Sequence, residues 1–548
     1  MQPPRVSSDR ASSVTRPDDV EEEEEEALLT GRPTQRRRKG PTNWILWGQI
    51  GLLAWALIAT IVAIILAVIY QHELSKPSHR TPTPHPPPTA PKPAPSPPPD
   101  DGPARGKRNL IFMVSDGMGP TSLHTTRSFR QFTDDLPYDD ILVLDQHHIG
   151  TSRTRSSSSL VTDSAAGATA FSCGNKSYNE AISVLPDHSP CGTVLEAASL
   201  AGYKTGLVVT TRLSDATPAC FASHANRRQY EDLIAEQEIG LHPLGRVTDL
   251  LLGGGRCHFV PSSANGSCRG DDMDLVSLAR QYGFHYVNDR VGFDALRLGS
   301  DAQLPLLGLF ADTDVPYEID RRFSQDVYPS LEEMSRTALT TLSQATKDSE
   351  QGFFLMIEGS RIDHAGHTND PAAQVHEVLA YDRAFSAVVD FLEHDSTPGV
   401  LVATSDHETG GLAAARQLHK SYPEYLWHPS VLARANHSAE YAALKLHEYD
   451  ASTNDKKKGN DAKRRKYIAK DLLGGMLGII DAAAWELDEL VKSDLPSEYI
   501  FSDIISRRAQ IGWSTHGHSG KFIVFFLASF VFCLRYSRCR RKHLRFIT

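Results

Sequence analysis

The chain has 548 residues, of which 40% are hydrophobic and 23% are charged, and its formal net charge is −10. This balance excludes a wholly disordered chain and a membrane protein built from many helices. The mild acidity argues against a nucleic-acid-binding protein, so no nucleic-acid partner is expected. Seven cysteines are too few for a scaffold held together by disulfides.

The first part of the chain predicts a tail, a membrane anchor and a stalk. Residues 1–43 are polar and low in complexity, which is typical of a disordered cytoplasmic tail. Residues 45–69 carry no charge and are long enough to cross a bilayer, so we predict a transmembrane signal anchor at 44–70 rather than a buried core helix. Because basic residues precede this anchor at 36–39, the rest of the chain is expected to be lumenal. The following segment, 71–108, is rich in proline, which predicts a semi-rigid stalk.

From Asn109 onward the pattern becomes globular. Four apolar runs without polar alternation predict strands that are buried on both faces, as in parallel sheets. These runs occupy residues 109–116, 205–215, 352–359 and 399–408. Helical stretches lie between them, for example at 193–202 and 371–394. We therefore predict an α/β catalytic domain over 109–520, a three-layer α/β/α sandwich around a large and mostly parallel sheet.

An acidic residue stands at or near the end of each of these four apolar runs. In open α/β sheets ligands bind beyond the carboxyl ends of the strands, so the acidic side chains are expected to meet there. Carboxylates gathered in this way repel one another unless cations lie among them, which predicts bound divalent metal ions. The residues are Asp116, Asp215, Glu358, Asp406 and the adjacent His407.

Two further motifs supply side chains that bind metals. The motif E-G-S-R-I-D-H-A-G-H contains Asp363, His364 and His367, and T-H-G-H-S-G contains His516 and His518. Mixed histidine and carboxylate ligands are typical of zinc with an open coordination position. Any one of these residues alone is explained as well by a solvated surface group. Their recurrence at separate strand ends favours a metal site.

The segment V-T-D-S-A-A-G-A-T-A suggests a nucleophile. Ser164 precedes small residues that can start a helix, and the first N–H groups of a helix form an anion site. A bound metal could ionise the Ser164 hydroxyl without a histidine base, although a helix cap alone would also explain this serine. Thr217, beside Asp215, carries an oxygen suited to Mg²⁺. Arg227 is suited to hold a phosphate through two N–H groups. Together, the acidic and histidine residues, Ser164 and Arg227 predict a lumenal metallohydrolase.

At these residues the chain resembles the alkaline phosphatase family, in particular its membrane-anchored vacuolar members in fungi. The resemblance extends from about Asn109 to Gly520. It implies hydrolysis of phosphate monoesters at alkaline pH through a phosphoserine at Ser164, with two zinc ions and one magnesium ion. It further implies a homodimer, a single-pass type II protein of the vacuolar membrane, and substrate-binding roles for Arg227 and His364.

The same resemblance distributes the metal ligands over three ions. The ligands implied for one zinc ion are Asp363, His367 and His518. Those implied for the other zinc ion are Asp406, His407, Ser164 and Asp116. Those implied for magnesium are Asp116, Glu358, Thr217 and, through water, Asp215.

The C-terminal segment 521–548 departs from the family pattern. Family members continue with a strand of the central sheet, whereas residues 522–534 here are apolar but too few to span a bilayer, and the remainder is strongly basic. We hypothesise that this tail is translated intron, because the codons of residues 520–522 can contain a splice-donor consensus. A transcript that reads straight through them would contradict the hypothesis. If the tail is genuine, a core strand is expected to be missing.

Several smaller features leave alternatives open. Glycosylation is predicted at three sequons, which begin at Asn175, Asn265 and Asn436. An oxidising lumen would allow two disulfides, with their connectivity left open, among Cys257, Cys268, Cys173 and Cys191. The alternative functions are a phosphodiesterase or sulfatase of the wider superfamily and a catalytically impaired membrane glycoprotein.

Overall fold

The computed structural model describes residues 106–453 and 461–529. The predicted tail, the predicted anchor at 44–70 and nearly all of the stalk lie outside the described residues, as does the end of the basic segment, 530–548. Among the described helices, none combines the length and the hydropathy that a bilayer crossing requires.

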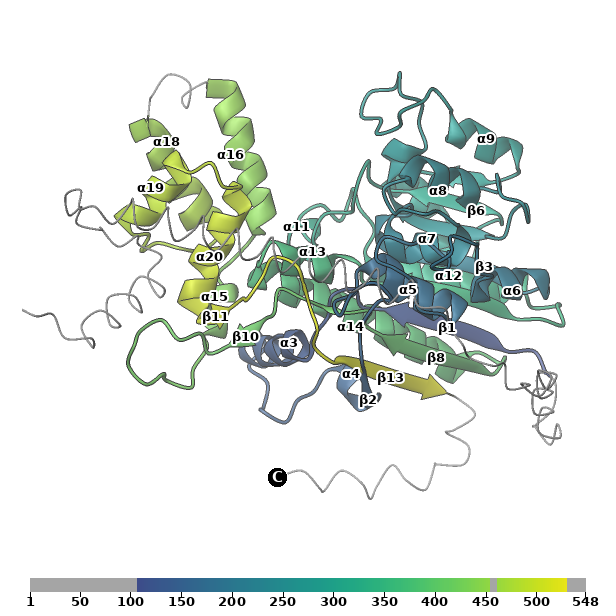
Figure 1. Cartoon of the computed structure of the whole chain (residues 1–548), viewed down its shortest axis with the longest axis horizontal. Coiled ribbons are helices and arrows are strands. Elements are labelled where there is room, and N and C mark those ends of the chain that lie inside the picture. The colour runs from purple at the N-terminus through teal and green to yellow at the C-terminus, as the bar shows by residue number, and fades with distance from the viewer. Residues whose placement is uncertain (1–105, 454–460, 530–548) are drawn as a thin grey trace, which may run out of the picture. The chain divides into compact units, whose positions relative to one another are not determined.

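A nine-stranded sheet forms the centre of the domain (Figure 1). Its strands are β1 (Asn109–Val114), β2 (His148–Ser152), β3 (Lys204–Arg212), β4 (Leu250–Gly254), β5 (His285–Val287), β6 (Leu306–Leu309), β7 (Phe353–Glu358), β8 (Gly399–Thr404) and β13 (Ile523–Ser529). Their order is β2-β13-β8-β1-β7-β3-β4-β6-β5. The strands from β8 to β5 pair in parallel, whereas β13 is antiparallel to both β8 and β2. The predicted mostly parallel sheet is thus confirmed.

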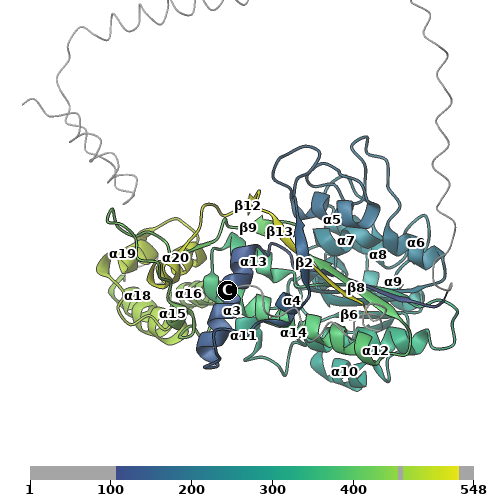
Figure 2. The same cartoon turned by 90° about the horizontal axis from the view of Figure 1, so that it is seen from below.

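Helices cover both faces of this sheet (Figure 2). On one face lie α5 (Ser164–Cys173), α6 (Val194–Leu200), α7 (Ala216–Ala222), α8 (Glu231–Glu238) and α9 (Leu275–Gln281). On the other lie α10 (Arg290–Ala295), α12 (Leu331–Ala345) and α14 (Pro371–His394). Successive residues of β7 alternate between the two cores, since Leu355 packs with α12 and α14 while Met356 packs with α6 and α7. Burial on both faces explains the continuous apolar runs of the strands.

A smaller group of helices gathers beside the sandwich around a hydrophobic cluster of its own (Figure 1). It consists of α15 (Pro429–Leu432), α16 (Ala439–Thr453), α18 (Asp461–Tyr467), the π-helix η3 (Ile468–Met476), α19 (Ala484–Lys492) and α20 (Ser497–Ala509). The other helical elements are α3 (Pro120–Thr133), α4 (Val143–Gln146), η1 (Arg256–His258), η2 (Arg297–Gly299), α11 (Glu318–Arg321) and α13 (Arg361–His367).

Two short antiparallel pairs bring the C-terminal motif to the sheet edge. They are formed by β9 (Glu408–Thr409) with β12 (His518–Ser519), and by β10 (Ala413–Ala414) with β11 (Ile511–Gly512). In the first pair His518 lies opposite Thr409. The pairing holds the T-H-G-H-S-G segment against the loop that follows β8.

Strand β13 corrects the expectation for the C-terminal segment. It extends the central sheet past Gly520, where we had ended the domain, and inserts between β2 and β8. Phe526 is fully buried and Val524 nearly so, and both belong to the core under the sheet. The segment is therefore not missing its strand. The sequence did not predict this strand, because basic residues follow the apolar run and because its pairing partners, β2 and β8, are distant in sequence.

Candidate active site

The carboxyl ends of four adjacent strands bring the predicted acidic residues together. Asp116 follows β1, Glu358 ends β7, Asp406 follows β8 and Asp215 follows β3, and these strands are neighbours in the order β8-β1-β7-β3. Asp215 is also the N-cap of α7, whose first turn contains the buried Thr217. All four carboxylates are buried, so each needs a partner that balances its charge.

For two of these carboxylates, burial and neighbouring carboxylates outweigh the cationic groups that the structure places near them. Burial, together with the nearby Asp406 and Asp363, raises the pKa of Asp116 well above its usual range, and its Oδ1 atom accepts no hydrogen bond within the described structure. Burial also raises the pKa of Glu358 to about 8, although the Ser360 hydroxyl donates a hydrogen bond to it at 2.5 Å. A divalent cation between these side chains would restore their charge, and carboxylate oxygens are suitable ligands for it.

Asp215 differs from its neighbours because two arginines contact it. Its carboxylate lies 3.0 Å from Arg212 Nη2 and 2.8 Å from Arg228 Nη2. Burial alone would raise the pKa of Asp215, but these two guanidinium groups outweigh burial and hold the pKa well below its usual range. We call Asp116, Asp215 and Glu358 the acid group.

The second cluster, which we call the histidine group, consists of Asp363, His367 and His518. His367 Nδ1 lies 2.5 Å from the carbonyl oxygen of His516, and His518 Nδ1 lies 2.8 Å from that of Thr162. Each Nδ1 must therefore donate a proton, which leaves a lone pair on Nε2 of a neutral ring. The two Nε2 atoms face each other at 3.1 Å beside the carboxylate of Asp363. A cation among them would remove this repulsion, and such carbonyl contacts are typical of metal-binding histidines.

In the protein without metal, a proton on His367 supplies part of the positive charge that a cation would bring. Burial lowers the pKa of His367, but the Asp363 carboxylate outweighs burial and raises this pKa to about 9. Burial and the nearby His407 lower the pKa of His518 to about 4. Burial would raise the pKa of Asp363, but the histidines, led by His367, lower it well below its usual range. The Thr409 hydroxyl also donates a hydrogen bond to Asp363. The histidine group therefore contains an ion pair of its own.

Ser164, at the first position of α5, adjoins His407, which itself contacts Asp116 of the acid group and stacks on His518 of the histidine group. Asp163 caps this helix through its side chain, so the N-terminus of α5 begins at the site. The Ser164 hydroxyl oxygen lies 3.1 Å from His407 Nε2. The same nitrogen is 3.0 Å from Asp406 Oδ2 and 3.5 Å from Asp116 Oδ1. These atoms form a compact cluster in which the serine oxygen adjoins candidate metal ligands, beside a helix end that attracts anions.

The structure does not bring Arg227 into this cluster. Its side chain is 64% exposed and comes no closer to an acidic group than 3.9 Å, from Nε to Glu180 Oε2. The adjacent Arg228 instead contacts Asp215 and approaches Asp163 Oδ2 at 3.9 Å. The two neighbouring side chains thus point in different directions, because the buried carboxylates attract Arg228, and the phosphate-binding role of Arg227 stays a prediction. The resemblance selected Arg227 because it stands three residues before Tyr230.

Two other predicted histidines lie at the border of the site. His364 Nδ1 is 3.5 Å from Asp314 Oδ2, and Asp314 in turn pairs with Arg212. His516 stacks on Tyr499 with ring centroids 4.2 Å apart and is exposed. Sequence reasoning overlooked several supporting residues because their partners are distant in the chain. They are Arg212, Arg228, Asp314, Ser360 and Thr409.

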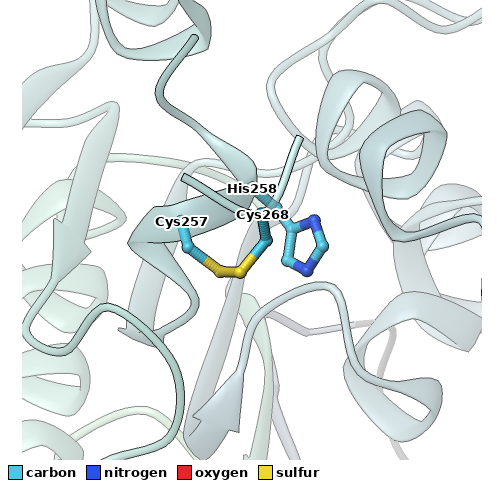
Figure 3. A group of neighbouring side chains, drawn as sticks. All are labelled: Cys257, His258 and Cys268. Atoms are coloured by element: carbon cyan, nitrogen blue, oxygen red, sulfur yellow. A yellow bond between two sulfur atoms is a disulfide. The ribbon is translucent and has the colours of Figure 1, made fainter. Parts of the chain in front are cut away.

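The structure forms both candidate disulfides, Cys173–Cys191 and Cys257–Cys268. His258 lies beside the second one (Figure 3) and pairs with Asp232 at 2.8 Å. Because the two sulfur atoms are bonded to each other, this cluster offers no free thiolate to a metal.

Buried carboxylates that require a cation, at the carboxyl edge of a parallel sheet, define the class of the protein as a metal-dependent α/β hydrolase. The family model for alkaline phosphatase matches residues 107–529. The repressible alkaline phosphatase of Saccharomyces cerevisiae is 55% identical over 430 residues, which cover 75% of this chain and 74% of that protein. The alkaline phosphatase of Schizosaccharomyces pombe is 51% identical over 415 residues, with coverages of 75% and 74%.

Solved structures agree with this relation. The alkaline phosphatase of Thermus thermophilus superposes with a TM-score of 0.63 at 28% identity, covering 77% of this chain and 86% of that one. The cold-active alkaline phosphatase of a psychrophilic Shewanella species superposes with a TM-score of 0.62 at 29% identity, with coverages of 77% and 93%. The chain belongs to the alkaline phosphatase family and is a metal-dependent enzyme that hydrolyses phosphate monoesters.

Proposed function

We propose that hydrolysis proceeds at alkaline pH through a phosphoserine at Ser164. The observation that carries this proposal is the position of the Ser164 hydroxyl, 3.1 Å from His407 Nε2 and at the N-terminus of α5. Further support is that His407 in turn contacts Asp116 of the acid group and stacks on His518 of the histidine group. A serine oxygen in this position can attack a phosphorus atom whose oxygens rest against the helix end.

The metals that fit these ligands are two zinc ions and one magnesium ion. The histidine group has the mixed ligands that zinc prefers, and Asp406, His407 and Ser164 offer a second set. Glu358, Thr217 and Asp116 offer only oxygen, which suits magnesium. When bound, these cations supply the positive charge that lowers the pKa of the serine hydroxyl and of water and balances the phosphoryl oxygens.

The residues of the chain then act in two steps. The Ser164 oxygen attacks phosphorus in line with the ester bond, the alcohol oxygen leaves, and a phosphoserine forms. A water molecule next attacks the phosphoserine from the opposite side, which releases inorganic phosphate and regenerates the hydroxyl. We infer that Arg228 binds the phosphoryl oxygens, supported by its contact with Asp215, and that the N–H groups of α5 contribute to the same task. Alkaline pH favours both steps because each nucleophile must lose a proton.

The test is hydrolysis of p-nitrophenyl phosphate at about pH 9 by the metal-loaded protein. We expect Ser164→Ala to lower kcat by at least about 1,000-fold, since a removed nucleophile typically costs that much or more. Ser172→Ala in the same helix is the matched control and keeps its activity, because Ser172 contacts Ser183 rather than the site. Equal activity of Ser164→Ala and the unaltered enzyme would contradict the mechanism.

The same assay separates the alternative activities. Bis(p-nitrophenyl) phosphate reports a phosphodiesterase and p-nitrophenyl sulfate reports a sulfatase. Faster hydrolysis of either of these than of the monoester would favour the alternative. A correctly folded, metal-loaded protein without activity on any of the three would be the catalytically impaired glycoprotein.

We further propose a type II membrane protein with a lumenal catalytic domain at the vacuolar membrane, acting as a glycosylated homodimer. The support is the uncharged stretch 45–69 behind the basic residues 36–39, the sequons and the family resemblance. In sealed vacuolar vesicles, added protease should spare the catalytic domain, and an endoglycosidase should reduce its apparent mass. Sedimentation of the detergent-solubilised enzyme tests the dimer. Cleavage of the domain in intact vesicles would contradict the orientation.

A further inference from the structure

A strongly basic cavity of about 450 Å³ opens beside the site. We call it the basic cavity, and its lining side chains include Arg153, Arg155, Lys176, Lys521, Leu160 and Phe522. The lining contains four cationic side chains and no acidic one. Its volume lies within the range of sites that hold small molecules.

The positive charge of this cavity is largely uncompensated. Within residues 106–453 and 461–529, no carboxylate pairs with Arg153, Arg155 or Lys176. Burial and the neighbouring Arg155 lower the pKa of Lys176, which shows that like charges approach one another here. Lys521 differs, because its ammonium group donates to the carbonyl oxygen of Leu412 at 2.8 Å and lies 3.5 Å from Glu408 Oε1, so the three other cations carry the uncompensated charge. Such a cavity attracts an anion with several charges.

Two of the lining segments run directly into the catalytic cluster. The segment 153–160 continues to Ser164, and four residues span at most about 14 Å. The segment 520–522 follows His518. Two hydrogen bonds connect these segments. Thr154 Oγ1 donates to the carbonyl oxygen of Lys521 at 3.4 Å, and His518 Nδ1 donates to the carbonyl oxygen of Thr162 at 2.8 Å. The cavity is therefore within reach of a substrate that occupies the site.

The third segment is tied to the residue that precedes the nucleophile. Lys176 begins a loop whose Asn179 Oδ1 accepts from the backbone N–H of Asp163 at 3.2 Å. In the same loop, the backbone N–H of Glu180 donates to Asp163 Oδ2 at 2.7 Å. All three lining segments are thus joined to residues of the catalytic cluster or to Asp163, either along the chain or by hydrogen bonds.

We propose that the basic cavity binds a second phosphate group on the alcohol part of the substrate, so that small organic bisphosphates are preferred substrates. The proposal rests on the function of Ser164 described above. Leu160 and Phe522, which are 82% and 58% exposed, offer apolar contact to the carbon chain between the two phosphates. The bisphosphate transfers one phosphoryl group to Ser164, and its alcohol leaves with the other phosphate still attached. Water then releases inorganic phosphate, so one bisphosphate and one water give one monophosphate and one phosphate.

The test uses the metal-loaded enzyme and a series of straight-chain alkanediol bisphosphates from butane to octane, each compared with the alkyl monophosphate of the same length. We expect kcat/KM for the best bisphosphate to exceed that of the monophosphate of the same length by about tenfold, after division by two for its two equivalent ends. This factor corresponds to one added charge-assisted hydrogen bond. In the double variant Arg153→Gln/Arg155→Gln this ratio should fall to near one. The ratio should also fall as salt is added, because the contact is electrostatic.

A matched control replaces an arginine of similar exposure elsewhere. Arg297→Gln, whose side chain is 75% exposed and pairs with Asp301, should leave the ratio unchanged. A ratio near one in the unaltered enzyme at every chain length would overturn the proposal, and so would an undiminished ratio in the double variant. Absence of monophosphate hydrolysis in the unaltered enzyme would instead overturn the mechanism at Ser164, so the two failures are distinguishable.

Discussion

The histidine group and the acid group both contain buried carboxylates that need a balancing positive charge, and they differ in how the protein supplies it. In the histidine group His367 takes up a proton and pairs with Asp363, so opposite charges meet even without a metal. In the acid group Asp116 and Glu358 have raised pKa values because burial and neighbouring carboxylates disfavour their ionised forms. Asp116 and Glu358 therefore depend more strongly on a bound cation for their charge than the histidine group does, because Asp363 keeps an ion pair with His367.

The largest loss of activity should separate two nearby histidines, His518 in the histidine group and His516 outside it. We expect His518→Ala to lower kcat/KM by at least about 100-fold and to reduce the zinc content, because it removes a proposed ligand. His516→Ala should cost less than about fivefold, since the atom of His516 that contacts His367 Nδ1 is a backbone carbonyl oxygen.

Steady-state kinetics on p-nitrophenyl phosphate and metal analysis by mass spectrometry measure both variants of this pair. If the two substitutions proved equally harmful, the assignment of His518 to the metal rather than to the fold would fail. Circular dichroism of both proteins controls for misfolding.

A smaller effect should separate the two adjacent arginines. Arg228→Gln removes a guanidinium that contacts Asp215 and approaches Asp163. We expect kcat/KM to fall by about 10- to 100-fold, the value of one charge-assisted hydrogen bond to a phosphoryl oxygen. Arg227→Gln should stay within about twofold, because its side chain is largely exposed. The inhibition constant of inorganic phosphate gives an independent measurement, and the reverse ranking would restore Arg227 as the phosphate-binding residue.

The smallest effect concerns the stability of the metal-free protein. With Glu358 shifted from 4.5 to about 8, the folded state retains a proton that the unfolded state has released. Stability should therefore fall as the pH rises through this window, by up to about 1.4 kcal/mol per pH unit. Urea unfolding of the chelated protein at several pH values measures the slope.

Glu358→Gln is the control for this slope, since the amide cannot lose a proton in that range. The metal-free variant should show a flatter profile than the metal-free unaltered protein, and adding metal should flatten the profile of the latter. An identical slope with and without the substitution would contradict the cause assigned here.

Local sequence patterns predicted much of the sandwich. The helix expected at 371–394 is α14, with Asp370 as its cap and Pro371 at its start, both of which act within one turn. The four apolar runs correspond to β1, β3, β7 and β8. Short strands such as β5 were not predicted, because three residues carry little periodicity.

Long-range pairing explains where the predictions failed. Ile523–Ser529 is a strand because it lies between β8 and β2, both distant in sequence, and its basic continuation gives no hint of that position. The choice between Arg227 and Arg228 depends on the carboxylates of Asp163 and Asp215, which different elements carry to the same place.

The amino-acid sequence identifies the chemical groups that are present and the strand ends at which they lie, because residue type and periodic patterns are local properties. Which of these groups share a site depends on the tertiary structure. It pairs β12 with β9 so that His518 faces His367, leaves Asp116 without a hydrogen bond at one oxygen, and turns Arg228 rather than Arg227 toward Asp215. These relations depend on distances between segments that are far apart in the chain, and those distances arise only when the sheet and its two helical layers pack together.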